Sequence, residues 1–71
     1  MNNVKFQKSA DELRIEDIQH VHLNGKESTI FKVYVKHYTP SGNESFVYSG
    51  QYSLEGTIKR ESTIKRKICL I

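Results

Sequence analysis

The clearest alternation of apolar and polar positions covers residues 29–38, which read TIFKVYVKHY. β-Branched and aromatic residues dominate this run, and the period of two predicts a strand. The next segment, TPSGNE at 39–44, combines proline with glycine and asparagine, which favour a turn. A second β-rich run at 45–53 then completes a predicted hairpin.

The register of this hairpin follows from keeping one face of the sheet apolar. Loops of two, four or six residues centred on Ser41 and Gly42 all give the same pairing, which places Val35 opposite Tyr48. The residues expected on the core face are Phe31, Val33, Val35, His37, Phe46, Tyr48 and Tyr52. Those expected on the opposite face are Ile30, Lys32, Tyr34, Lys36 and Tyr38, beside Ser45, Val47, Ser49, Gln51 and Ser53.

An earlier hairpin is predicted at Asn24-Gly25, the dipeptide that most strongly favours a two-residue turn. A two-residue loop and a four-residue loop differ by a shift of two and therefore give the preceding strand the same core face. That face contains Ile18, His20 and His22. The four-residue loop is favoured because it sets Val21 opposite Ile30, a good cross-strand pair. The result is a three-stranded antiparallel meander from about residue 17 to about residue 53.

The segment before the meander mixes two signals. Residues 9–12, SADE, match a helical capping box, whereas residues 13–16, LRIE, alternate as a strand does. We expect one short helical turn or an irregular entry there.

The segment after the meander contains the tetrapeptide TIKR twice, at 57–60 and again at 63–66. As a strand, this spacing places Ile58, Ile64, Ile68 and Leu70 on one face. As a helix, it aligns Ile64, Ile68 and Ile71. The density of β-branched residues favours the strand.

The chain is expected to form one domain over residues 1–71, because a chain of this length buries only roughly 60% of its surface. Three strands alone provide too little core and leave their edges open. The predicted fold class is therefore mainly β, a small antiparallel meander that closes into a roll or small barrel with the C-terminal segment as a further strand. The alternative is an α+β fold with a short helix at one flank.

Charge is concentrated at the C-terminus. Residues 57–71 contain five basic side chains and one acidic one, a charge of +4 in a chain whose net charge is +3. Basic termini are a recurrent footprint of polyanion binding, and tyrosines on a sheet can stack on bases. The basic residues of the C-terminal segment also suit a solvated edge strand. The lysines and tyrosines of the sheet also suit a second face that is half-covered by another part of the chain. The candidate nucleic-acid-binding residues are Lys32, Tyr34, Lys36, Tyr38, Lys59, Arg60, Lys65, Arg66 and Lys67.

Catalysis is not expected. The serines are not in a nucleophile-elbow motif, the four glycines are isolated, and no catalytic or cofactor-binding set is apparent. His20 and His22, with Glu27 across the turn, match a metal site only weakly, so no metal or other cofactor is predicted. Cys69 is the only cysteine and is expected to be a small apolar residue in a strand.

Two classes of binding protein remain. The first is a small accessory or regulatory protein that binds nucleic acid, and the alternative is an inhibitor or adaptor that binds a protein through an exposed strand edge or as a homodimer. The sequence contains no segment of about twenty apolar residues and begins without an apolar signal segment. We therefore expect a cytoplasmic protein with no membrane partner.

Overall fold

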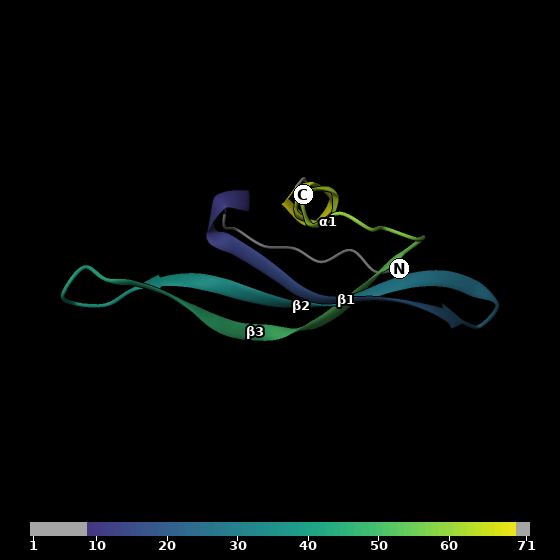
Figure 1. Cartoon of the computed structure of the whole chain (residues 1–71), viewed down its shortest axis with the longest axis horizontal. Helices are drawn as coiled ribbons and strands as arrows, with labels where there is room; N and C mark the ends of the chain where they lie inside the picture. The colour runs from purple at the N-terminus through teal and green to yellow at the C-terminus, as the bar shows by residue number, and fades with distance from the viewer. Residues whose placement is uncertain (1–8, 70–71) are drawn as a thin grey trace.

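The computed structural model describes residues 9–69, which form one antiparallel sheet with a helix on one of its faces (Figure 1). The sheet has three strands in the order β1-β2-β3, so the chain is mainly β as expected. The elements are a 3-10 turn η1 (Ala10–Glu12), β1 (Leu13–Leu23), β2 (Lys26–Tyr38), β3 (Glu44–Glu55) and α1 (Glu61–Cys69). In the described part of the chain the sheet is open, so the expected closure into a roll or small barrel is not confirmed.

The first hairpin has a tight two-residue turn. Asn24 and Gly25 both have positive φ, 52° and 78°, and Leu23 pairs with Lys26. The four-residue loop favoured from the sequence is therefore wrong, because a turn with two left-handed residues matches the twist of the flanking strands better. The meander is also longer than expected, because β1 already begins at Leu13, directly after the short helical turn of η1.

A β-bulge interrupts β1 between Glu16 and Gln19, before that hairpin. Glu16 pairs with Lys32 and Gln19 with Ile30, so two residues of β1 oppose one residue of β2. One of them is Asp17, whose φ of 55° is unusual for a residue other than glycine. The bulge shifts the alternation of β1 by one residue. The odd-numbered residues of β1 before the bulge and the even-numbered residues after it therefore lie on the same face of the sheet, which is the core face.

The second hairpin has a loop of odd length. Tyr38 pairs with Glu44, which leaves five loop residues, and the amide of Gly42 and the carbonyl of Asn43 both bond back to Thr39. An odd loop shifts the register by one residue, so the predicted positions of β3 next to the loop are on the wrong face. Val35 pairs with Val47, not Tyr48.

A bulge in β3 then restores the predicted pairing. Tyr34 pairs with Tyr48 and Val33 with Gly50, which leaves Ser49 as the extra residue. Beyond this point the register agrees with the prediction. The correction concerns Phe46 and Tyr48, which lie on the face opposite the core, and Ser45 and Val47, which lie on the core side.

The C-terminal segment forms a helix, so the strand preferred from the sequence is wrong and the helical alternative is correct. Ile64 and Ile68 are one helical turn apart and both are 0% exposed against the sheet. Their tertiary packing outweighs the weak helix propensity of β-branched residues. Leu70 and Ile71 lie outside the described residues.

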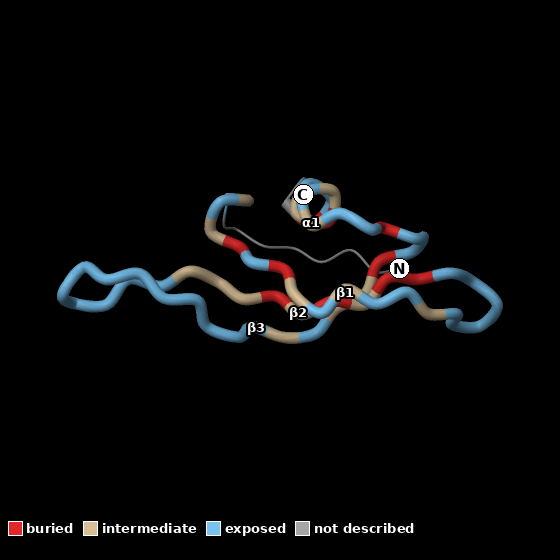
Figure 2. Tube along the Cα trace, in the orientation of Figure 1, coloured by how far each residue is buried: buried red, intermediate tan, exposed pale blue. Residues whose placement is uncertain are grey.

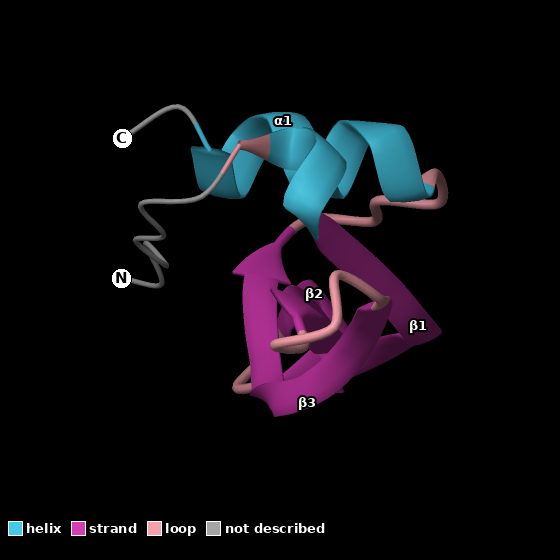
Figure 3. Ribbon diagram, turned by 90° about the vertical axis from the view of Figure 1, so that its left-hand side faces the viewer, coloured by secondary structure: helices cyan, strands magenta, loops and turns pink. Residues whose placement is uncertain are grey.

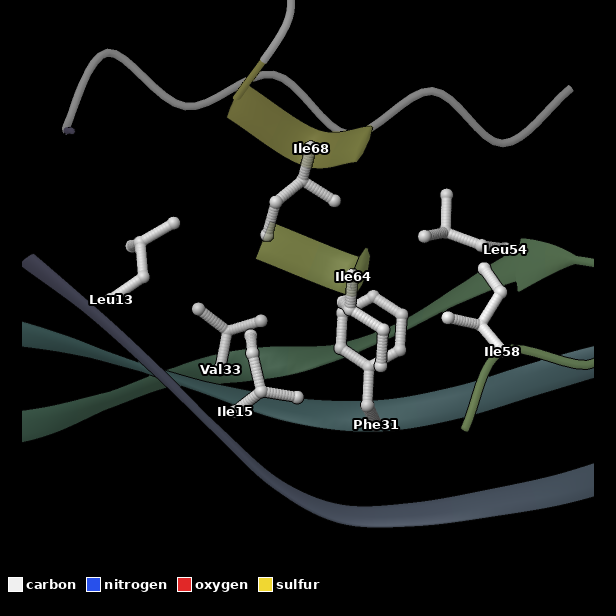
Figure 4. Close-up of a cluster of buried hydrophobic side chains, with 8 residues drawn as sticks. All are labelled: Leu13, Ile15, Phe31, Val33, Leu54, Ile58, Ile64 and Ile68. Atoms are coloured by element: carbon white, nitrogen blue, oxygen red, sulfur yellow. The ribbon is translucent and has the colours of Figure 1, made fainter. Parts of the chain in front are cut away.

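The core lies between α1 and the middle of the sheet (Figures 3 and 4). The structure measures 48 × 22 × 17 Å, and the two hairpin ends extend beyond the helix as exposed backbone (Figure 2). The buried apolar residues are Leu13, Ile15, Phe31, Val33, Leu54, Ile58, Ile64 and Ile68.

The chain crosses the sheet between β3 and α1, and Thr29 fixes this crossing. The Thr29 side chain is fully buried, and its hydroxyl donates to the carbonyl of Gly56 at 2.8 Å. The same oxygen accepts the N–H of Ile58 at 2.8 Å. Because both partners belong to the crossing segment, the Thr29 hydroxyl satisfies two backbone hydrogen-bonding groups of that segment. It thereby holds the segment at the position from which α1 begins over the sheet.

Candidate functional site

The nine candidate residues lie on two opposite sides of the sheet. The four from β2 alternate with Phe31 and Val33, which face α1, so they lie on the face that the helix leaves uncovered (Figure 3). The other five belong to α1 and the segment before it. These candidates were predicted from a sheet face and from a basic C-terminal segment, and the fold places the two groups on opposite sides because α1 packs against the core face.

The uncovered face of the sheet, here called the open face, contains an aromatic cluster. The rings of Tyr34 and Tyr48 meet edge to face, with centroids 5.5 Å apart and planes at 63°. Beside them the Arg14 guanidinium lies 5.5 Å from the centre of the Phe46 ring, and Lys36 Nζ lies 5.9 Å from the same ring. The sequence pattern placed Phe46 and Tyr48 on the core face, because it did not indicate the loop of odd length that turns them to this side.

Positive charge on the open face is largely matched by carboxylates. Lys32 Nζ lies 3.1 Å from Asp17, and this hydrogen bond, with the attraction between the two charges, raises the pKa of Lys32. Arg14 pairs with Glu16 at 3.0 Å. Lys36 Nζ lies 3.7 Å from Glu44, and Lys26 Nζ lies 3.4 Å from Glu55. The open face is therefore aromatic and amphipathic, with little net charge.

The helix side has the opposite character. Lys59, Arg60, Arg66 and Lys67 are exposed, and no carboxylate oxygen of residues 9–69 lies within 4.0 Å of any of them. We call these four the basic helix surface. Arg66 lies two residues from both buried isoleucines of α1, so its side chain points directly away from the sheet.

The fifth predicted cation of this segment, Lys65, is neutralised within the helix. Its Nζ lies 3.2 Å from Glu61, one turn earlier. Burial raises the pKa of the Glu61 carboxyl, but the hydrogen bond from the Ile15 N–H, at 3.2 Å, and the nearby Lys65 outweigh burial and lower the pKa overall. Glu61 therefore ties α1 to β1 and removes Lys65 from the basic helix surface.

His20 and His22 line a shallow cavity of about 350 Å³, together with Val21, Glu27 and Thr57. His20 Nε2 donates to the carbonyl of Ile58 at 3.1 Å, so this ring is bound to the crossing segment. His22 Nε2 lies 4.0 Å from Glu27, as the two-residue turn requires. Within residues 9–69, no three histidine, cysteine or acidic side chains are arranged to hold a metal ion.

Two further predictions concern Cys69 and membrane-spanning helices. Cys69 is the last residue of α1, so its expected place in a strand is wrong. Its side chain lies outside the part that the structure describes, so its apolar role stays a prediction. Among the described residues no helix is both long and apolar enough to cross a membrane.

Comparison with known proteins finds no match among protein-family models, curated proteins or solved structures.

Proposed function

We propose that this protein binds nucleic acid through the basic helix surface, as a small accessory protein without catalytic activity of its own. One observation carries the proposal: positive charge without a carboxylate partner among the described residues gathers on one side, over α1 and the residues before it. Exposed cations of this kind bind phosphates by displacing the counterions that surround a nucleic acid.

The chemistry of this surface favours the phosphate backbone over base edges. Lys59 and Arg60 precede the helix and Arg66 and Lys67 occupy its last turn, so the charges are spread along a stretch of about 10 Å. This separation suits several phosphates of one strand, which follow one another at intervals of a few ångströms. The expected binding is weakly dependent on sequence and strongly dependent on salt.

The open face is a second surface of different chemistry, on the other side of the sheet. Its exposed rings suit stacking on unpaired bases, and its paired charges contribute little to attraction of phosphate. A phosphate backbone bound along α1 does not reach these rings. The proposal therefore assigns affinity to the basic helix surface, and a loss of single-strand binding on replacing Tyr48 would reveal an added stacking contribution.

The test is a salt titration of binding to a labelled duplex DNA, measured by fluorescence anisotropy. The variant combines Arg60→Gln, Arg66→Gln and Lys67→Gln, which removes charge from exposed positions and leaves the core intact. The logarithmic salt slope should fall by up to about 0.9 for each lost phosphate contact, and so by up to about 2.7 in total. A matched control, Lys32→Gln with Lys36→Gln, removes charge from the open face and should change the slope little.

Two results would contradict the proposal. One is the absence of binding to duplex or single-stranded nucleic acid at low salt. The other is an equal loss of affinity in the control variant, which would transfer the interaction to the open face.

A further inference from the structure

The two edges of the sheet differ in how they are protected. The β1 edge contains the Asp17 bulge and charged residues, and α1 packs over it. Glu61 of that helix accepts the N–H of Ile15, so part of this edge is already hydrogen-bonded. Bulges, charges and a covering helix are the devices by which sheets avoid pairing with another strand.

The β3 edge has fewer of these devices: it contains the Ser49 bulge, but no helix is packed against it in the described residues. Residues 45–54 form ten consecutive positions without a charge or a proline. Phe46, Val47 and Tyr48 are 36%, 49% and 51% exposed, and these neighbours are three of the five large apolar residues exposed in the described chain. Since successive residues of a strand point to opposite faces, both faces of the sheet are uncovered here, and β3 is an edge strand because the strand order is β1-β2-β3.

This edge is complementary to a second copy of itself. In an antiparallel pair of two β3 strands centred on Val47, each Val47 faces Val47 of the second copy. The neighbouring pair on each side is Phe46 with Tyr48, and the Ser49 bulge follows directly after it. Aromatic pairs across strands stabilise a sheet, and this register brings no like charges together.

The competing register is less favourable. A pair centred on Tyr48 sets Val47 opposite Ser49 and Phe46 opposite Gly50. Neither apolar side chain then meets an apolar partner across the strands. The run of exposed apolar residues at 46–48 therefore favours the register centred on Val47.

We propose that this chain forms a two-fold symmetric dimer in which the β3 edges pair antiparallel around Val47, giving a continuous six-stranded sheet. Isologous pairing of this kind closes on itself and leaves the protected β1 strands as the outer edges. The basic helix surfaces do not oppose it, because α1 packs over β1, at the far side of each sheet from the interface.

The symmetry has a geometric consequence. Antiparallel pairing of identical edges requires a two-fold axis perpendicular to the sheet, so both helices lie on the same face of the dimer. The two basic helix surfaces then face one polyanion together, which increases affinity through effective concentration. This consequence rests on the proposed function, whereas the dimer itself does not.

The test measures molar mass in the absence of nucleic acid, by light scattering and sedimentation from about 1 μM to about 1 mM protein. The wild-type mass should rise to twice the monomer mass within this range. Val47→Lys and Val47→Glu should each remain monomeric, because each places two like charges at the symmetry axis. A mixture of the two variants should regain the doubled mass, because the charges are then opposite.

Controls separate lost pairing from lost folding. Val47 is outside the core, so both variants should melt as the wild-type monomer does. The matched control is Leu23→Lys, which makes the same change at a residue 47% exposed on the other hairpin, and it should still dimerise. A wild type that stays monomeric at every concentration would overturn the dimer. So would variants at Val47 that still dimerise alone, or a mixture that stays monomeric.

Discussion

On one face of the sheet β2 presents Phe31 and Val33 to α1, and on the other face the same strand presents Lys32 and Tyr34 to solvent. The covered face is apolar and almost fully buried, and the open face holds its aromatic rings among paired charges. This small protein therefore obtains most of its stability from one face. Substitutions on the other face remove little buried area and should change stability less.

The largest expected effect is the loss of Ile64 from the covered face. Ile64→Ala leaves a cavity between α1 and the sheet and should lower the free energy of unfolding by about 2–5 kcal/mol, measured by urea denaturation. If that variant does not fold, Ile64→Val should still show a loss of about 0.5–1.5 kcal/mol. Arg66→Ala, in the same helix but facing solvent, is the control and should change stability by less than about 0.5 kcal/mol. Equal losses at the two positions would contradict the packing of α1.

The next effect concerns the polar contact within the covered face. Thr29→Val keeps the shape of the side chain but leaves the Gly56 carbonyl and the Ile58 N–H without their partner. Stability should fall by about 1–3 kcal/mol in the same denaturation experiment. A neutral result would show that the crossing segment does not depend on this hydroxyl.

A smaller effect is expected on the open face. Tyr34→Ala removes the edge-to-face contact with Tyr48 and should cost about 0.5–1.5 kcal/mol, with thermal unfolding still cooperative. The double variant with Tyr48→Ala should cost less than the sum of the two single changes, because both remove the same contact. A loss from Tyr34→Ala as large as that from Ile64→Ala would remove the distinction between the two faces.

The smallest effect depends on pH. Because the folded protein lowers the pKa of Glu61 below its ordinary value of 4.5, the ionised carboxylate stabilises the fold above that pH. This contribution is lost as the pH falls through the lowered pKa. Glu61→Gln should therefore be less stable than the wild type at about pH 7, by under about 1 kcal/mol, and the difference should shrink near pH 3. A difference that grows on acidification would contradict this origin.

Local sequence signals predicted the centre of the sheet well. The alternation around Phe31 and Val33 placed β2 on the correct face, and Asn24-Gly25 marked the first turn. These features depend on neighbours in sequence, such as left-handed turn residues and a period of two. The short helical turn before β1 was likewise visible as a capping signal.

Features that depend on distant contacts were not predicted. The helix forms because Ile64 and Ile68 find the sheet beneath them, although their β-branched side chains favour a strand locally. The five-residue loop and the Ser49 bulge compensate each other, and neither has a distinctive sequence. The division of the candidate residues between two sides of the sheet was not predicted, because it follows from the position of α1.

The elongated shape has a consequence for motion. At each hairpin end the strands are joined by backbone hydrogen bonds and their side chains are exposed, whereas the buried apolar contacts are confined to the middle of the sheet. The ends can therefore open and reclose while the centre stays intact, so one strand contains amides with very different protection from hydrogen exchange. In β2 the amides near Phe31 exchange only when the whole domain opens, and those near Tyr38 exchange through local fraying of the hairpin.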